Sequence, residues 1–196
     1  MKRSFFHGSV KGWLRGLVLA AVMVFGGASA ARADDAKHYA EVKQELAQDR
    51  GIQRGFPRLG GNFEVIGEAT QRYNCIAHSL GTHERWVNPE TGPSHAPLSG
   101  MDRLYADKGY YREHELNWRA ESGLEKVVLY ATLNPDGTID QVTHAAHQER
   151  DGTFTSKLGQ LPVIRHETPE ALRGPTYGLP VAVYVRPING NLRAAR

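Results

Sequence analysis

Cysteine is scarce in this chain, whose 196 residues include a single one, Cys75. A sole thiol cannot form an internal disulfide, so packing rather than a disulfide framework has to stabilise the fold. Three roles are open to Cys75: a small buried residue, a link to another chain, or a nucleophile. A buried and unreactive cysteine is the most frequent of these, so residue type alone does not decide among them.

Long apolar segments are lacking as well. The apolar run from Leu17 to Phe25 is shorter than the roughly 20 residues that cross a bilayer. Basic residues precede this run and Ala31-Arg32-Ala33 follows it, which is the arrangement of a cleaved export signal. We therefore expect a signal peptide over residues 1–33, with a retained anchor as the alternative. The protein is then periplasmic or secreted, with no stable membrane insertion after cleavage.

Basic residues are not concentrated in the rest of the chain. Residues 1–33 hold five of the 24 lysines and arginines and none of the 21 acidic residues, so the remainder carries a formal net charge of −2. Nucleic-acid binding needs a basic stripe, and we expect no nucleic-acid partner. The sequence also has no Gly-rich phosphate loop after a strand and no Gly-x-Ser-x-Gly serine elbow.

The remaining sequence predicts helices first and a β-rich second half. Apolar spacings of three and four predict a helix over residues 35–50 that Gly51 ends, and a short helix is expected over residues 100–108. Glycine and proline content predicts a long loop over residues 86–100. Apolar stretches bounded by turn residues predict five strands, at residues 63–67, 125–131, 139–148, 153–157 and 179–185. The expected fold class is α+β.

Cys75 stands where a short apolar helix is expected to begin. Asn74 is a typical N-cap residue and Gly81 a typical stop, which predicts a helix from Cys75 to Leu80. The positive end of a helix dipole favours the thiolate over the thiol. Tyr73 either donates a hydrogen bond to an oxyanion at this position or packs against the start of the helix.

A cysteine nucleophile needs a histidine base, and His144 is the best placed of the nine histidines. Alternation along a strand puts His144 and Ala146 on one face and His147 on the other. Small alanines beside His144 leave room for a helix end to approach it, although a plain surface histidine is the alternative. Because a strand points His144 and His147 apart, we expect no metal site, and no cofactor is indicated.

Several blocks of the chain resemble a family of uncharacterised bacterial domains. Members share the pattern YNCIAxxLG, KxxLY, HxA, DGxWTSKxG and H, and the resemblance covers about residues 63–185. The matching blocks are Tyr73-Asn74-Cys75-Ile76-Ala77, Gly109-Tyr110, Glu125-Lys126-Val127-Val128-Leu129-Tyr130, His144-Ala145-Ala146, Asp151-Gly152-Thr153-Phe154-Thr155-Ser156-Lys157-Leu158-Gly159 and His166. The order of these blocks is also similar to that of papain-like cysteine peptidases of the NlpC/P60 kind.

This resemblance implies a papain-like α+β domain over residues 63–187, with N-terminal helices packed on an antiparallel sheet. An N-terminal helix and linker would occupy residues 34–62, and residues 188–196 would form a tail.

The resemblance also implies roles for particular residues. Cys75 would be the nucleophile, His144 the general base and His166 the group that orients the base. Tyr73 and Asn74 would position the substrate or its oxyanion. A Ser-Lys-x-Gly motif has no role that the sequence explains, and we expect a tight turn there; its residues are Ser156, Lys157 and Gly159.

Two functions from different classes follow. The first is an exported cysteine hydrolase that acts on amide or peptide bonds, with cell-wall peptides as the expected substrate. The second is a non-catalytic papain-like binding or interaction domain in which Cys75 is inert and packed. A disulfide-linked dimer through Cys75 is a third alternative.

Overall fold

The structure is a computed structural model that describes residues 32–188. The predicted signal segment up to residue 31, and the predicted tail from residue 189, lie outside the described residues. The described residues divide between two compact units, residues 32–39 and residues 40–188. The described part of the first unit, residues 32–39, is helical, and residues 40–48 at the start of the second unit are helical too. Within residues 32–188, no helix is long and apolar enough to cross a bilayer.

The predicted end of the first helix is wrong. The helix ends at residue 48, and a new helix, α2 (Arg50–Gly55), begins directly afterwards. Asp49 is the N-cap of α2, since its backbone is extended and its Oδ1 accepts a hydrogen bond of 2.8 Å from the Ile52 amide. Gly51 therefore lies inside α2 rather than at a helix end, because the aspartate cap determines where the new helix starts.

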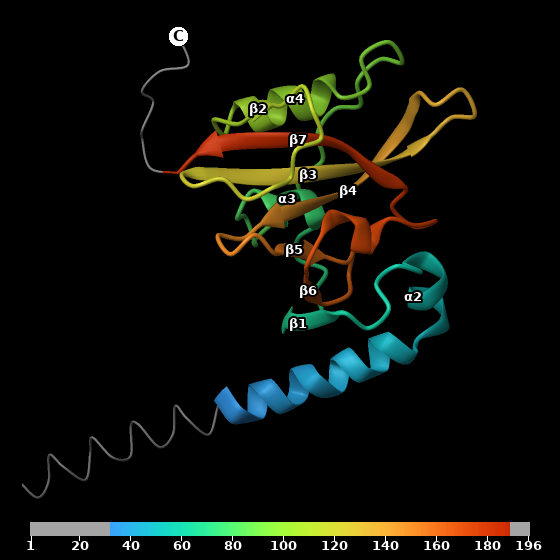
Figure 1. Ribbon diagram of the computed structural model, residues 1–196, viewed down its shortest axis with the longest axis vertical. Helices are drawn as coiled ribbons and strands as arrows, with labels where there is room; N and C mark the ends of the chain where they lie inside the picture. Colours follow the sequence, from blue (N-terminus) through green and yellow to red (C-terminus); the bar gives the residue numbers. More distant parts are fainter. Residues whose placement is uncertain (1–31, 189–196) are drawn as a thin grey trace, which may run out of the picture. The chain divides into compact units, whose positions relative to one another are not determined.

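Seven strands form one antiparallel sheet in the second unit, in the order β1-β6-β5-β4-β3-β7-β2 (Figure 1). The α+β class and the antiparallel sheet are thus confirmed. All five predicted strands are present, whereas β2 and β6 were missed because they are too short to show alternation. The strands are β1 (Phe63–Gly67), β2 (Tyr111–Arg112), β3 (Leu124–Leu133), β4 (Ile139–Gln148), β5 (Phe154–Lys157), β6 (Val163–His166) and β7 (Leu179–Pro187).

Strand β3 lies at the centre of the core. It pairs with β4 on one side and β7 on the other, and its residues 127–131 are buried. Burial on both faces explains why this strand reads as a continuous apolar run rather than an alternating one. Tyr105 of helix α4 (Ser99–Ala106) stacks on Tyr184 of β7, with ring centroids 4.6 Å apart, in the same cluster as Leu129.

Helix α3 (Cys75–Ser79) packs against β4 and β5 (Figure 1). Its Ile76 and Ala77 are buried, and the Ser79 hydroxyl forms hydrogen bonds of 2.8 Å to the Ile76 carbonyl and 2.7 Å to the Tyr105 hydroxyl. The chain from residue 82 to residue 98 has no helix or strand, as predicted for most of it. This arrangement fixes the position of Cys75 over the sheet.

Candidate functional site

Cys75 is the first residue of α3, as the sequence predicts. Asn74 has the extended backbone of an N-cap, and its Oδ1 accepts a hydrogen bond of 3.0 Å from the Ala77 amide. Gly81 follows the helix with a φ of 69°, a left-handed conformation that glycine adopts without strain. The sequence therefore located the start of this helix correctly and placed its end one residue too late, since Leu80 is the C-cap.

Asn74 also holds the loop that follows α3. Its Oδ1 accepts a second hydrogen bond, of 3.2 Å, from the Val87 amide, and its Nδ2 donates to the Val87 carbonyl at 2.9 Å and to Asn88 Oδ1 at 3.2 Å. Both amide hydrogens are thus engaged. Asn74 can donate to a substrate oxyanion only by releasing the loop, so its geometry is that of an anchor for the segment beside Cys75.

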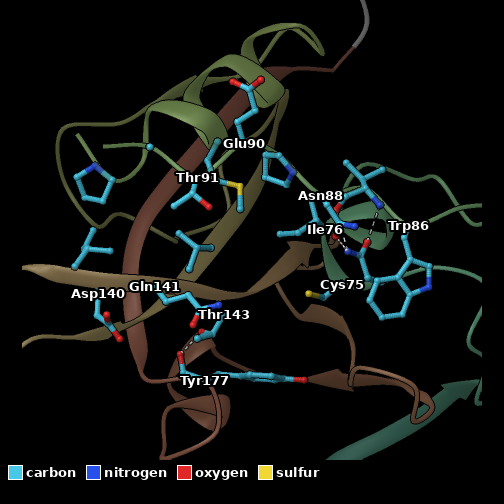
Figure 2. Close-up of a pocket in the computed structure, with 18 of the residues that line it drawn as sticks. Cys75, Ile76, Trp86, Asn88, Glu90, Thr91, Asp140, Gln141, Thr143 and Tyr177 are labelled. Carbon is cyan, nitrogen blue, oxygen red and sulfur yellow. Dashed lines mark hydrogen bonds between the residues drawn. The ribbon is translucent and has the colours of Figure 1, made fainter. Parts of the chain in front are cut away.

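A cavity of about 810 Å³ opens at Cys75 (Figure 2). Its walls come from the start of α3, the loop at residues 86–97, the first half of β4, and four further residues, Met101, Asn134, Gly159 and Tyr177. Trp86 lines the cavity as well, and its indole Nε1 donates a hydrogen bond of 2.6 Å to the Gln71 carbonyl. The size is that of a typical small-ligand or peptide site.

The Cys75 thiol is partly enclosed at this cavity. Burial raises its pKa, and the backbone amides of Ala145 and Ile76 and the positive charge of Lys157 act in the opposite direction. The outcome is a raised pKa, so the start of α3 does not by itself produce the thiolate that the sequence suggested. Five residues make a short helix with a correspondingly small dipole.

His144 is fully buried on β4 and belongs to a chain of hydrogen bonds. Its Nε2 lies 3.0 Å from Ser156 Oγ on β5, which lies 3.0 Å from His166 Nε2 on β6. His166 Nδ1 lies 2.8 Å from the Thr168 carbonyl oxygen. The structure therefore brings together three of the residues that the sequence singled out, with Ser156 as the bridge between the two histidines.

The Thr168 carbonyl determines the direction of every bond in this chain. A carbonyl only accepts, so His166 carries its proton on Nδ1, and its Nε2 accepts from the Ser156 hydroxyl. Ser156 has one hydrogen, which is used, so it accepts in turn from His144 Nε2–H. His144 Nδ1 consequently carries no proton. This buried nitrogen has no hydrogen-bond partner among the described residues.

Both histidines of the chain are neutral near pH 7. Burial and the neighbouring His166 hold the pKa of His144 well below its usual range, and burial lowers the pKa of His166 to about 4. Tyr177 stacks on His144 with ring centroids 4.0 Å apart and also lines the cavity. His144 thus lies directly behind a residue of the cavity wall.

The arrangement of Cys75 and His144 differs in two respects from the one that the sequence predicts. No hydrogen bond joins the Cys75 sulfur to His144 in residues 32–188, and His144 itself does not line the cavity. Tyr73 does not line it either. The Tyr73 ring lies near His83, with ring centroids 4.8 Å apart, and near the Lys157 ammonium, which is 5.6 Å from its centre.

The Ser-Lys-x-Gly motif acquires a structural meaning. Lys157 Nζ donates hydrogen bonds of 2.6 Å to the carbonyls of Gly159 and Leu161, which closes the turn between β5 and β6. Gly159 has a φ of 58° in this turn and lines the cavity. Ser156 bridges the histidines, so each named residue of the motif serves either the hydrogen-bond chain or the cavity wall.

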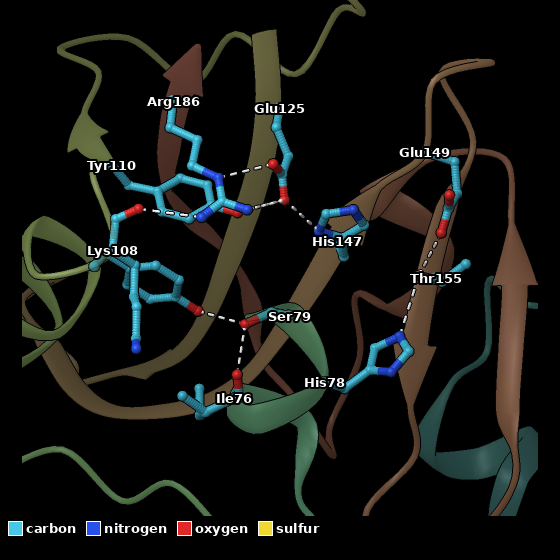
Figure 3. Close-up of polar contacts among 11 residues, drawn as sticks. Ile76, His78, Ser79, Lys108, Tyr110, Glu125, His147, Glu149, Thr155 and Arg186 are labelled. Atoms are coloured by element: carbon cyan, nitrogen blue, oxygen red, sulfur yellow. Dashed lines mark hydrogen bonds and ion pairs between the residues drawn. The ribbon is translucent and has the colours of Figure 1, made fainter. Parts of the chain in front are cut away.

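His147 lies on the opposite side of β4 from His144, as strand alternation predicts. Its Nδ1 is 3.7 Å from Glu125 Oε1, and the same carboxylate binds Arg186 and the Tyr110 hydroxyl (Figure 3). Among the described residues, no group of three potential ligands is arranged to hold a metal ion.

Sequence reasoning missed Tyr177 and Thr168. Tyr177 lies in an irregular segment after the 3₁₀ helix η1 (Pro169–Leu172), and Thr168 acts through its backbone carbonyl. Neither residue carries a side-chain pattern that could have identified it.

Fold and site together define a mixed α+β domain in which a buried His-Ser-His chain lies beside a cysteine-lined cavity. Residues 64–185 match the family described as "Domain of unknown function (DUF7689)", and the chain belongs to that family. This confirms the expectation that the chain belongs to a family of uncharacterised domains. No curated protein and no solved structure matches the chain.

Proposed function

We propose that the chain is an exported papain-like cysteine hydrolase that cleaves an amide or peptide bond, with Cys75 as the nucleophile and His144 as the general base. The proposal rests on the state of His144 Nδ1, which is unprotonated and has no hydrogen-bond partner among the described residues. A buried imidazole whose other nitrogen is committed to Ser156, and whose pKa is low, holds a free lone pair at neutral pH. A general base needs that lone pair.

The reaction can be written from these residues. His144 Nδ1 takes the thiol proton of Cys75 while the sulfur attacks the carbonyl carbon of the substrate. The imidazolium then returns the proton to the departing amine, which leaves a thioester. Water, deprotonated by the same nitrogen, hydrolyses the thioester and restores the thiol. Ser156 keeps the ring oriented throughout by accepting the Nε2–H of His144, and His166 fixes Ser156 by accepting its hydroxyl hydrogen.

The backbone at the start of α3 is the best candidate for oxyanion binding. The first amides of a helix have no intrahelical acceptor, and those of Cys75 and Ile76 face the Cys75 sulfur, whose pKa they lower. They belong to residues that line the cavity. We therefore assign oxyanion binding to these amides, and not to Tyr73 and the Asn74 side chain, for which the sequence suggested it.

Cys75 and His144 are not hydrogen-bonded in the described residues, so the proposed reaction requires a rearrangement that brings the two groups together. Catalytic hydrogen bonds are often long in ligand-free enzymes and tighten when substrate binds. Tyr177 contacts both the cavity and His144, so an occupied cavity acts directly on the residue that covers the base. For an exported hydrolase of this size, peptides of the cell wall are the expected substrates.

The decisive experiment measures alkylation of Cys75 by iodoacetamide against pH in the wild type and in His144→Gln. Loss of the base is expected to slow alkylation near pH 7 several-fold, because the thiol loses its proton acceptor. His147→Gln is the matched control, since it makes the same change on the other face of β4. Equal rates in all three proteins, each following an ordinary thiol with a pKa of about 8.5, contradict the proposal.

A non-catalytic binding domain is the second candidate, and two observations favour it. Cys75 has a raised pKa, and no hydrogen bond to His144 is present in the described residues. A binding domain would retain its affinity for peptides in Cys75→Ser and would show no peptide turnover in the wild type. Turnover that Cys75→Ser abolishes excludes this alternative.

A further inference from the structure

Lys157 is a buried cation without a carboxylate partner. Its side chain is 0% exposed, and its ammonium donates to two backbone carbonyls, those of Gly159 and Leu161. Within residues 32–188, no carboxylate lies within ion-pair distance of it. Carbonyl dipoles satisfy hydrogen bonds but carry no net charge, so the positive charge stays uncompensated.

The other buried lysine shows what compensation looks like in the same fold. Lys126 is also 0% exposed, but its ammonium forms ion pairs with Glu121 and Glu113, in addition to a hydrogen bond of 2.9 Å to the Asn117 carbonyl. Burying an ammonium without a counter-charge destabilises the folded state, because the charge loses its hydration. The contrast with Lys126 indicates that the negative partner of Lys157 is not a carboxylate but a group that becomes negatively charged when it loses a proton.

The surroundings of Lys157 leave one such group. Its ammonium lies over the Tyr73 ring, two residues before Cys75, and it holds the turn that presents Gly159 at the cavity beside Cys75. Burial lowers the pKa of Lys157, while the charge that Cys75 can acquire raises it. The interaction is mutual, since the ammonium acts on the Cys75 thiol in the opposite direction.

Burial keeps two histidines and three tyrosines around the pair neutral near pH 7. Burial lowers the pKa of His78 to about 4, with His83, His147 and Lys157 acting in the same direction, and holds the pKa of His144 well below its usual range. The pKa values of the neighbouring tyrosines are raised by burial; these are Tyr73, Tyr105 and Tyr177. Lys157 is therefore the charge that a thiolate at Cys75 meets.

We propose that Lys157 is a positioning residue that stabilises the Cys75 thiolate, its ammonium being the buried counter-charge of the sulfur. The two carbonyl bonds fix the ammonium in place and hold the Gly159 turn at the cavity. Lys157 gives up no proton, since the thiol proton goes to His144 Nδ1. The catalytic meaning of this role rests on the proposed hydrolase, whereas the charge interaction itself does not.

The test is the pH dependence of Cys75 alkylation in Lys157→Met and Lys157→Arg. Removing the charge is expected to raise the alkylation midpoint by one pH unit or more, about a tenfold loss of thiolate below the midpoint. A more basic thiolate is also more nucleophilic, so the rate near pH 7 falls only about threefold. Lys157→Arg retains the charge and is expected to keep the midpoint near that of the wild type.

Lys126→Met is the matched control, because it removes a buried ammonium whose charge carboxylates already balance. It is expected to leave the midpoint unchanged. If Lys157→Met does not fold, the reciprocal measurement decides: the Lys157 side chain is titrated by NMR in the wild type and in Cys75→Ser. The thiolate raises the pKa of Lys157, so Cys75→Ser is expected to lower it.

The outcomes separate this inference from the proposed function. An unmoved midpoint in Lys157→Met, or equal Lys157 titrations with and without the thiol, overturns the inference even if His144→Gln slows alkylation. A raised midpoint in Lys157→Met, with no effect of His144→Gln, supports Lys157 and contradicts the hydrolase.

Discussion

At the scale of single residues, the protonation of His144 is determined at a distance. The Thr168 carbonyl orients His166, His166 orients the Ser156 hydroxyl, and the hydroxyl assigns the proton of His144 to Nε2. A histidine base is useful only in the tautomer that leaves the correct nitrogen free. Ser156 is the link in this chain that can be removed without touching either ring.

Ser156→Ala is therefore expected to release the tautomer of His144. The change leaves two buried ring nitrogens without partners, at a cost of about 1–3 kcal/mol in the free energy of unfolding. Nitrogen chemical shifts of His144 should then show a mixture of tautomers in place of the Nε2–H form. The control is Thr155→Val, on the same strand as Ser156. It removes a hydroxyl that is hydrogen-bonded to His78 instead of to His144 or His166. A His144 that remains purely Nε2–H in Ser156→Ala contradicts the chain.

Sequence reasoning at this scale found the groups but not their connections. Cys75, His144 and His166 were singled out from residue types and block order, and the structure brings both histidines into one chain. The bridge through Ser156 was not foreseen, because hydrogen bonds across β4, β5 and β6 depend on strand register. Tyr177 was missed because its place against His144 depends on tertiary packing.

At the scale of elements, Asn74 joins a helix to a loop. Its oxygen caps α3, and its nitrogen binds Val87 and Asn88 in the wall of the cavity. Exposed loops of this length are usually variable in position, whereas this one is tied to the residue beside Cys75. The two functions of the side chain reside in different atoms.

Two substitutions at Asn74 should separate these functions. Asn74→Asp retains the capping oxygen and loses both donors, so we expect a stable α3 with a displaced loop, seen as a changed Trp86 fluorescence. Asn74→Ala loses the cap as well, with a further cost of about 1 kcal/mol in the free energy of unfolding. Identical fluorescence and stability in the two variants would argue against separate roles.

The elements that the sequence predicted well are those with strong local signals. Strands β1 and β4 have the expected bounds, and α3 has the expected start, because apolar pattern and cap residues specify them. Helix α2 was missed since Asp49 starts a new helix within a pattern that reads as continuous. Strand β6 has four residues and is defined by its partners, β1 and β5.

At the scale of the whole molecule, several buried histidines couple stability to pH. The pKa values of His78 and His166 are lowered to about 4 by burial, and that of His144 lies well below its usual range. In the unfolded chain these groups take up protons near pH 6.5. The unfolded state thus binds protons first as the pH falls, and the folded state loses stability.

The free energy of unfolding is accordingly expected to fall between about pH 6.5 and 4, and these histidines contribute no further change above about pH 7. The slope is about 1.4 kcal/mol per pH unit for each histidine, so three of them give a steep decline. Urea unfolding at several pH values measures it. His78→Gln should reduce the slope, whereas His95→Gln, an exposed position, should not. A flat profile from pH 7 to 5 excludes buried neutral histidines.

A main-chain carbonyl, that of Thr168, determines the tautomer of His144. This affects which sequence positions can vary among members of the family. Any amino acid at position 168 supplies the same oxygen, so that position can change freely while His144 retains its tautomer. Positions 156 and 166 are different, since each is useful only while the other offers its matching donor or acceptor. In functional relatives, these two positions should change together, and position 168 should change alone.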